Sequence, residues 1–128
     1  MKVPRKRPTD GELEILRVLW ERGASTVRQV HETLETRRPG GYTTVLKLLQ
    51  IMTEKGLVRR DETERAHVYA ARVPREETER QLVADLLDRA FAGSASALVL
   101  RALSSKKTSP QELARIRSLL DAMEGGKQ

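Results

Sequence analysis

One face of the segment 42–55 carries residue types that can read DNA bases. At about 100° per residue, the polar and the apolar side chains of a helix here fall on opposite faces. The polar face holds Thr43, Lys47, Gln50 and Glu54, flanked by Thr44 and Ile51, and the apolar face holds Val45, Leu48, Leu49 and Met52. Hydroxyl, ammonium and amide groups can hydrogen-bond to base edges in a major groove. We therefore expect Thr43, Thr44 and Lys47 to contact bases or nearby phosphates, with Tyr42 positioning the helix start. An amphipathic helix with a merely solvated polar face is the alternative.

A basic hairpin is predicted directly after this helix. Gly56 stands where a left-handed helix cap is favoured, and Leu57 stands where such a cap makes its hydrophobic contact. Two β-prone runs follow, 57–61 and 66–71, and a polar turn at 62–65 joins them. The arginines of the hairpin are Arg59, Arg60 and Arg65. A helix followed by a basic hairpin is the arrangement of a winged helix-turn-helix, whose wing reaches DNA phosphates. Ordinary surface arginines remain the alternative for Arg60 and Arg65.

Two capping boxes predict two helices ahead of this recognition helix. Thr9 with Glu12, and Thr26 with Gln29, each match the pattern in which a hydroxyl residue is followed three positions later by Glu or Gln. Gly23 separates the two helices. The predicted order of elements is therefore helix, helix, helix and hairpin.

Further cations near the start of the chain are candidate phosphate contacts. Arg28 lies in the first turn of the second helix, where an unpaired cation opposes the helix dipole. It faces a phosphate, or it pairs with Glu32 at i,i+4. Residues 1–8 form a basic arm that adds phosphate or minor-groove contacts, or else is a solvated tail. The candidate residues of the arm are Arg5, Lys6 and Arg7.

The chain divides into a basic first part and a nearly neutral second part. Residues 1–74 hold 15 basic and 10 acidic side chains, whereas residues 75–128 hold 9 and 8. The shift coincides with Val73-Pro74. We therefore predict a winged-helix DNA-binding domain over 9–74 after the arm, and a helical dimerisation region over 75–128.

The second part is predicted to form three helices that need a partner. They are expected over 75–91, over 95–103, and after Ser109, which caps a helix that has Pro110 at its first position. About 50 residues this apolar cannot bury themselves alone, since chains this short make marginal cores. Pairing with a second copy is the natural solution. The proposed interface residues are Leu86, Leu98, Leu113, Ile116 and Leu120.

Composition argues against several other classes of function. The net charge of +6 and the pI near 10.1 favour a polyanionic partner, while 3% aromatic residues argue against base-stacking single-strand binders. Cysteine is absent, which excludes thiol chemistry and thiolate metal sites and fits a cytoplasmic protein. His31 and His67 lie on separate elements without a catalytic constellation, and a lone histidine is usually packing or solvated surface. We expect neither an enzyme, nor a cofactor or metal, nor a membrane span of about 20 apolar residues.

Four runs of the sequence together resemble a known family. They are TDGELEILRVLWERGASTVRQVHETL, YTTVLKLLQIMTEKGLVRR, AHVYAARVPREE and LLDRAFAGSASALVL. From Thr9 to Met123 the chain resembles the BlaI/MecI/CopY family of penicillinase-type repressors. The resemblance implies a mostly α fold with a small β-hairpin, namely a winged helix-turn-helix with a C-terminal helical dimerisation region. It also implies a homodimeric repressor of a palindromic DNA operator; a winged-helix protein-interaction module without sequence-specific DNA binding is the alternative.

The chain departs from parts of the family pattern. Many members control β-lactam resistance genes and are removed by a membrane-bound sensor protease, which cuts an Asn-Phe bond in the second dimerisation helix. The matching position here is Arg101-Ala102, so a protease acting on this chain needs a different preference. Other members sense copper through C-terminal cysteines, and a chain without cysteine lacks the ligands for that branch.

Overall fold

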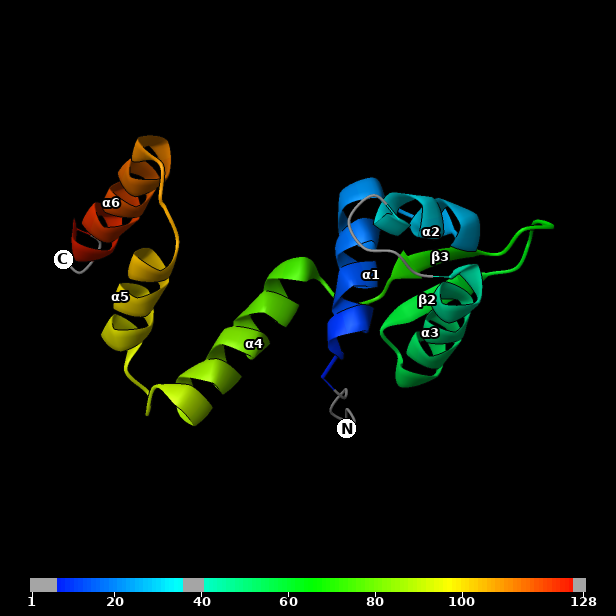
Figure 1. Ribbon diagram of the computed structural model, residues 1–128, viewed down its shortest axis with the longest axis horizontal. Coiled ribbons are helices and arrows are strands. Elements are labelled where there is room, and N and C mark those ends of the chain that lie inside the picture. The colour runs from blue at the N-terminus through cyan, green and yellow to red at the C-terminus, as the bar shows by residue number, and fades with distance from the viewer. Residues whose placement is uncertain (1–6, 36–40, 126–128) are drawn as a thin grey trace. The chain divides into compact units, whose positions relative to one another are not determined.

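The computed structural model describes residues 7–35 and 41–125 as two compact units (Figure 1). Unit 1 comprises Met1–Gln81 and unit 2 comprises Leu82–Gln128. The elements, in chain order, are α1 (Asp10–Arg22), β1 (Ser25–Thr26), α2 (Val27–Glu35), α3 (Tyr42–Lys55), β2 (Val58–Asp61), β3 (Val68–Ala71), α4 (Arg75–Ala90), α5 (Ala95–Ser105) and α6 (Pro110–Gly125). The division falls inside α4, so the predicted domain boundary at residue 74 stays a prediction.

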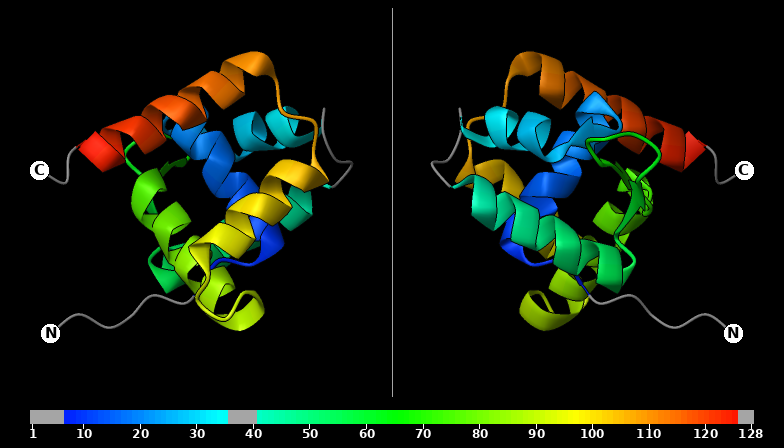
Figure 2. Two further views of the ribbon diagram at one scale, coloured as in Figure 1. Left: turned by 90° about the vertical axis from the view of Figure 1, so that its left-hand side faces the viewer. Right: turned by 90° about the vertical axis from the view of Figure 1, so that its right-hand side faces the viewer.

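The core of unit 1 is apolar and lies between three helices and a small sheet. Helices α1, α2 and α3 pack against one another, and the sheet packs against α1 and α3 (Figures 1 and 2). The core consists of Ile15, Leu16, Val18, Leu19, Val27, Val30, Val45, Leu49, Met52, Leu57, Val58, Tyr69 and Val73. These residues recur at helical spacing in α1 and α3, which is the pattern that buries one face of a helix.

Both predicted capping boxes are present. At the start of α1, the Thr9 N–H donates to Glu12 Oε1 at 2.9 Å and the Glu12 N–H donates to Thr9 Oγ1 at 3.3 Å. At the start of α2, the Thr26 N–H donates to Gln29 Oε1 at 2.9 Å and the Gln29 N–H donates to Thr26 Oγ1 at 3.2 Å. Each box satisfies backbone donors that the helix itself leaves unpaired. Gly23 ends α1 with φ of 89°, as predicted.

Helix α3 and its cap are those that the sequence predicts. Gly56 has φ of 84° and ψ of 14°, and its N–H donates to the carbonyls of Met52 and Thr53. The Leu57 N–H donates to the Met52 carbonyl at 2.9 Å, and the Leu57 side chain is buried. This is a left-handed cap with its hydrophobic contact, and it turns the chain from α3 directly into the sheet.

The predicted hairpin is confirmed, but the sheet has a third strand. Strands β2 and β3 pair antiparallel from Val58↔Ala71 to Asp61↔Val68. Each is shorter than the predicted run, because Leu57 precedes β2 and because Ala66 and His67 belong to the connecting loop. Strand β1 pairs with β3, with Ser25 opposite Tyr69. A two-residue strand is too short to show an alternating pattern, so the sequence gives no signal for it. We call the β2–β3 hairpin with its loop the wing. The strand order is β1-β3-β2, so β1, which leads directly into α2, is paired with a strand of the wing.

The first turn of α4 belongs to unit 1. Trp20 Nε1 donates to the Val73 carbonyl at 2.9 Å, and the Arg75 guanidinium lies 5.9 Å from the centre of the Trp20 ring. Thr78 is buried and its hydroxyl donates to the Pro74 carbonyl at 3.0 Å. Trp20 therefore packs at the edge of the core, where its ring N–H still finds an acceptor.

Unit 2 contains the rest of α4 together with α5 and α6. The three helices are confirmed, with α5 reaching two residues beyond the predicted end. Ser94 caps α5 through a bond from the Ala97 N–H, and Ser109 caps α6 through a bond from the Glu112 N–H. Within the part of the chain that the structure describes, no helix has the length and apolar character to cross a membrane.

Candidate nucleic-acid interface

Helix α3 presents a polar stripe to solvent. Thr43, Thr44 and Lys47 are exposed, and so is Gln50 farther along the helix, while the opposite face is buried in the core. Tyr42 begins the helix and is 46% exposed. Gly41 precedes it and supplies no side-chain cap, so no side chain at the cap position competes for the first N–H groups. The stripe thus combines donors and acceptors on a rigid element, which is what base readout requires.

The wing holds its arginines in different surroundings. Arg60 Nε lies 2.6 Å from Glu62 Oε2, and a hydrogen bond to the Tyr69 side chain, followed by the charge of Glu62, raises the pKa of Arg60. Arg59 and Arg65 are exposed. The carboxylate of Asp61 accepts the Thr63 N–H at 2.9 Å, and this bond lowers the pKa of Asp61. The loop is therefore ordered by its own polar groups while Arg59 and Arg65 project into solvent.

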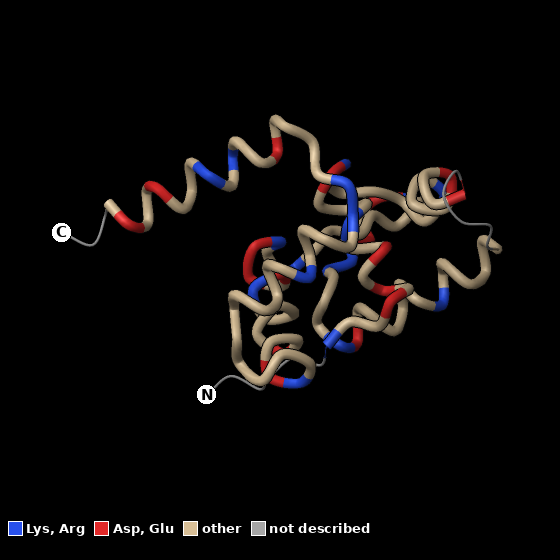
Figure 3. Tube along the Cα trace, turned by 60° about the vertical axis from the view of Figure 1, so that its left-hand side comes forward, with Lys and Arg blue, Asp and Glu red and all other residues tan. Residues whose placement is uncertain are grey.

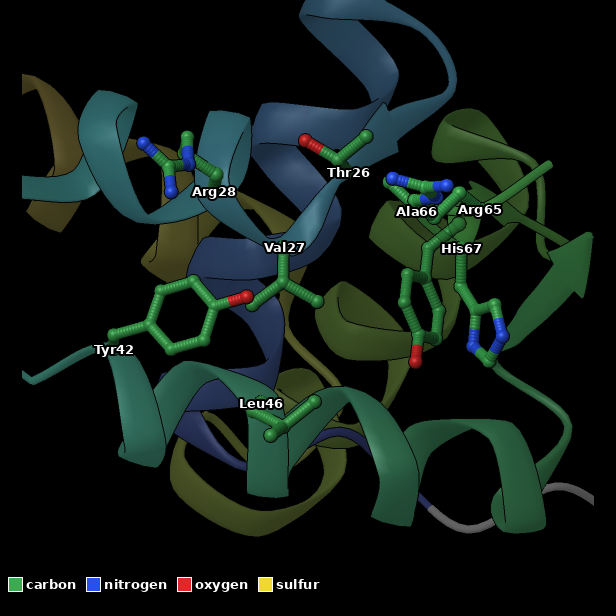
Figure 4. A pocket seen from close by; sticks show the side chains of 9 residues that line it. Thr26, Val27, Arg28, Tyr42, Leu46, Arg65, Ala66 and His67 are labelled. Atoms are coloured by element: carbon green, nitrogen blue, oxygen red, sulfur yellow. The ribbon is translucent and has the colours of Figure 1, made fainter. Parts of the chain in front are cut away.

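A cleft of about 460 Å³ lies between the start of α2, the start of α3 and the wing (Figure 4). Its lining residues are Thr26, Val27, Arg28, Tyr42, Leu46, Arg65, Ala66, His67 and Tyr69. Three of the predicted DNA-binding residues meet here, namely Arg28, Tyr42 and Arg65. No lining residue is acidic. The arrangement suits an anion, because two guanidinium groups border a space that contains no carboxylate.

The structure separates the other predicted contacts from this cleft. Arg59 and Arg60 lie on β2 and do not line it. Arg7 is exposed ahead of α1, and Arg5 and Lys6 lie outside the described residues. The predicted alternative for Arg28, an ion pair with Glu32, is not among the ion pairs of the residues that the structure describes.

Sequence reasoning did not single out six of the cleft residues as parts of a site. The sequence marks Thr26 as the cap of a helix and places Tyr69 in a β-prone run. It indicates for His67 only packing or solvated surface. Val27, Leu46 and Ala66 have no polar side chain that could mark a site. The missing signal is the pairing of β1 with β3, which brings residues about 40 positions apart to one place.

A buried ion pair fixes α3 on α1. Lys55 Nζ lies 2.8 Å from Glu12 Oε1 and 2.9 Å from Oε2, and Glu12 is only 2% exposed. The same carboxylate accepts the Thr9 N–H, so it joins the capping box of α1 to the last turn of α3. The pair lies at the end of α3 opposite Tyr42, so it anchors the last turn of α3 to the start of α1.

Unit 2 exposes apolar side chains. Leu86 and Leu120 are 44% and 54% exposed, whereas the other predicted interface residues, Leu98, Leu113 and Ile116, are half-buried. Val83, Val99, Leu100, Leu119 and Met123 are exposed as well. Helix α6 carries both acidic and basic residues (Figure 3), so it does not present charge of a single sign.

The expected cleavage position lies inside a helix. Arg101 and Ala102 are exposed residues of α5. The hydroxyls of Ser104 and Ser105 donate to the carbonyls of Leu100 and Arg101 at 2.6 Å and 2.5 Å. A protease needs an extended backbone, so the last turns of α5 would have to open before a cut here.

Within residues 7–35 and 41–125, no group of three side chains is placed to hold a metal ion. The fold and the polar stripe define a winged helix-turn-helix protein.

Comparisons with known proteins agree on the family. The model of the family described as "Penicillinase repressor" matches residues 8–122. The transcriptional regulator BlaI of Mycobacterium tuberculosis (strain ATCC 25618 / H37Rv) is 37% identical over 120 residues, which cover 91% of this chain and 86% of the relative. The penicillinase repressor of Bacillus licheniformis is 21% identical over 113 residues, covering 88% of both chains. The chain belongs to the penicillinase repressor family, and is a transcriptional repressor of the BlaI type rather than an enzyme.

Solved structures support the fold. The solution structure of the DNA-binding domain of the repressor BlaI has a TM-score of 0.50 and 22% identity, and the match covers 58% of this chain and 93% of that domain. RosR of H. salinarum has a TM-score of 0.52 and 20% identity, over 92% of this chain and 94% of that one. These likenesses confirm the winged-helix architecture.

Proposed function

We propose that this repressor acts as a homodimer on a two-fold symmetric DNA operator. Thr43, Thr44 and Lys47 of α3 read bases in the major groove, and the wing contacts the sugar-phosphate backbone through Arg59, Arg60 and Arg65. Arg5, Lys6 and Arg7 add contacts from the arm. A two-fold dimer presents its two α3 helices to half-sites about one helical turn apart.

The observation that carries this proposal is the position of the cleft beside the polar stripe. Tyr42 and Leu46 line the cleft and lie on one flank of the stripe that contains Thr43 and Lys47. A helix in a major groove runs between two sugar-phosphate backbones, so an acid-free cleft along its flank meets one of them. Base readout and backbone contact thus come from adjacent surfaces of one unit.

The test is a salt titration of binding to a random-sequence DNA duplex. Affinity should fall steeply with salt, because each neutralised phosphate releases a counterion. A winged helix that serves only as a protein-interaction module would show flat or absent duplex binding. Footprinting of the chain's own upstream region then identifies the operator, since such repressors often control their own operon.

The exposed apolar residues of unit 2 support the homodimer. Leu86 on α4 and Leu120 on α6 are 44% and 54% exposed. Large apolar side chains that stay exposed support an interaction site when they lie together on a surface. A second copy supplies the same surface, and a two-fold axis makes the two surfaces self-complementary.

Relief of repression is proposed to follow a cut near Arg101-Ala102 by a membrane-bound sensor protease, with β-lactam resistance or related genes as the targets. Such a cut severs α6 from the rest of unit 2, and the two half-sites are no longer read as one. The repressor acts in the cytoplasm, where it meets its operator. The check is an immunoblot of the host after treatment with a cell-wall antibiotic. A full-length band that persists while the target gene turns on would exclude proteolytic induction.

A further inference from the structure

His67 is the third side chain of the cleft that can carry a positive charge, besides Arg28 and Arg65. It lies on the loop of the wing, between Ala66 and β3, and it is exposed. In the close view, the rings of Tyr42 and His67 lie on opposite sides of the cleft, with Val27 and Leu46 between them (Figure 4). An imidazole therefore faces the same space as the guanidinium-bearing residues Arg28 and Arg65.

The charged and titratable groups around His67 are cations or phenols. Arg28 lies on α2 and Tyr42 lies on α3. Arg65 lies on the loop of the wing, and Tyr69 lies on β3. The carboxylates of the wing do not line the cleft: Asp61 accepts the Thr63 N–H, Glu62 pairs with Arg60, and Glu64 is exposed on the loop. No carboxylate is therefore among the residues that line the cleft with His67.

We propose that protonated His67 binds a backbone phosphate of operator DNA in this cleft, so that DNA binding takes up protons, on average about half a proton per chain between pH 6 and pH 8. The inference rests on the proposed function, and it names the part of the DNA that the cleft receives. A phosphate oxygen can accept a charge-assisted hydrogen bond from the imidazolium, on the side of the cleft that Arg65 also lines (Figure 4).

The sign of the pH effect follows from linkage. A phosphate in the cleft favours the charged form of the imidazole, because opposite charges attract. The DNA complex therefore holds more protons than the free protein and free DNA. Affinity rises as pH falls through the range in which histidine gains its proton, roughly pH 8 to 6.

The experiment measures binding of the full-length chain to a random-sequence DNA duplex at pH 6 and pH 8 and at several salt concentrations. Between pH 6 and pH 8 the affinity per chain should fall about tenfold, the equivalent of one charge-assisted hydrogen bond. The slope of log affinity against log salt should be steeper at pH 6 by about 0.9, since one more phosphate is neutralised.

The chain offers a matched control, because it contains two histidines. His31 lies on α2 with its ring centre 5.9 Å from that of Tyr42, and it does not line the cleft. His67→Gln should abolish the pH dependence, and His31→Gln should keep it. His67→Arg carries a charge at both pH values, so it should bind at pH 8 as tightly as the parent binds at pH 6.

The outcomes separate this inference from the proposed function. Duplex binding that is absent, or insensitive to salt, contradicts the proposed function itself. Salt-dependent binding with the same pH dependence in the parent and in His67→Gln overturns the role of His67 alone. Loss of the pH dependence in His31→Gln instead would assign the proton to the other histidine and also overturn it.

A second measurement distinguishes DNA from a free anion as the source of the phosphate. The NMR signals of the His67 ring, assigned by their loss in His67→Gln, should move when duplex is added. Inorganic phosphate at the same ionic strength should leave them in place. Signals that move with inorganic phosphate and not with duplex would assign the cleft to a small anion and overturn the proposal.

Discussion

Neighbouring arginines of the wing differ in what they can offer to DNA. Arg60 donates to Tyr69 and pairs with Glu62, so part of its hydrogen-bonding capacity is used inside the wing. Arg59 is exposed and makes no ion pair with another residue that the structure describes. A guanidinium that is free to turn toward a phosphate contributes directly to sequence-independent binding.

Replacing Arg59 with Ala should weaken binding to all duplexes alike and reduce the salt slope by about 0.9, because one phosphate contact is lost. The measurement is a salt titration on an operator duplex and on a random duplex. Lys107→Ala is the control, since it removes one exposed cation from unit 2 and should leave the slope nearly unchanged. An Arg59→Ala slope equal to that of the parent would remove Arg59 from the interface.

Replacing Lys47 with Ala should cost about 1–3 kcal/mol of binding free energy on the footprinted operator, because a base contact is lost. The loss should be larger there than on random duplex, and the comparison is made at one salt concentration. Lys107→Ala in unit 2 removes the same charge away from α3 and serves as the control. If Lys47→Ala binds the operator as tightly as the parent, α3 is not the reading element.

Single residues could be predicted where one side chain's type and local spacing decide its role. The stripe of α3 follows from helical periodicity, and Gly56 follows from the left-handed conformation that a helix cap needs. His67 and Glu12 in their present roles could not be predicted. His67 joins the cleft only because β1 pairs with β3, and Glu12 meets Lys55 across 43 positions of sequence.

At the scale of elements, a buried carboxylate joins α3 to α1. Glu12 has two independent partners, the Thr9 N–H and Lys55 Nζ. A buried ion is costly unless its charge is compensated, so the pair is sensitive to the loss of one member. The contact lies between the two helices that frame the core of unit 1.

Replacing Lys55 with Met should lower the free energy of unfolding by about 3 kcal/mol, because Glu12 remains buried without its cation. Adding Glu12→Gln to that variant should recover part of the loss, since the uncompensated charge is gone while the capping geometry is kept. Urea denaturation of the parent, both single variants and the double variant measures the coupling. Additive single effects would show that the two side chains do not interact.

Helices α1, α2 and α6 were predictable because each has its own start signal. Thr9, Thr26 and Ser109 are caps that lie directly before an apolar periodic run. The hairpin was predictable from its β-formers, but its limits were not, because Ala66 and His67 are compatible with either strand or loop. Strand β1 consists of two residues whose pairing depends on a partner 42 to 44 positions away, so local pattern cannot reveal it.

At the scale of the whole molecule, DNA affinity should depend on how many copies act together. One winged helix offers one stripe and one cleft, and it contacts one half-site. Joining two such units raises the effective concentration of the second at its half-site, which multiplies affinity without any new contact. We therefore expect the proposed dimer interface to be as important for repression as the proposed DNA-reading residues.

Replacing Leu120 with Asp should convert the full-length protein to a monomer at micromolar concentration, because a charge is placed on the proposed apolar interface. Operator affinity should fall at least tenfold, while affinity for a single half-site should be unchanged. Ser118→Asp adds the same charge to the other side of α6 and should remain dimeric. Sedimentation decides the oligomeric state, and a parent chain that sediments as a monomer would contradict the homodimer.

A fragment made to isolate the DNA-binding unit should end at residue 81 rather than 74. The buried Thr78 and the contact of Arg75 with Trp20 belong to unit 1. A shorter fragment would remove these contacts from the edge of the core, and its lower affinity would then mix loss of folding with loss of dimerisation.

The pairing of β1 with β3 also bears on the entropy of association. Ser25 and Thr26 lead directly into α2 and are paired with the strand that closes the wing, so two walls of the cleft are held by one sheet. A binding surface whose parts are already fixed gives up little conformational freedom when a ligand arrives. The cleft should therefore bind DNA as a preformed surface, with a small ordering cost and little rearrangement of its backbone.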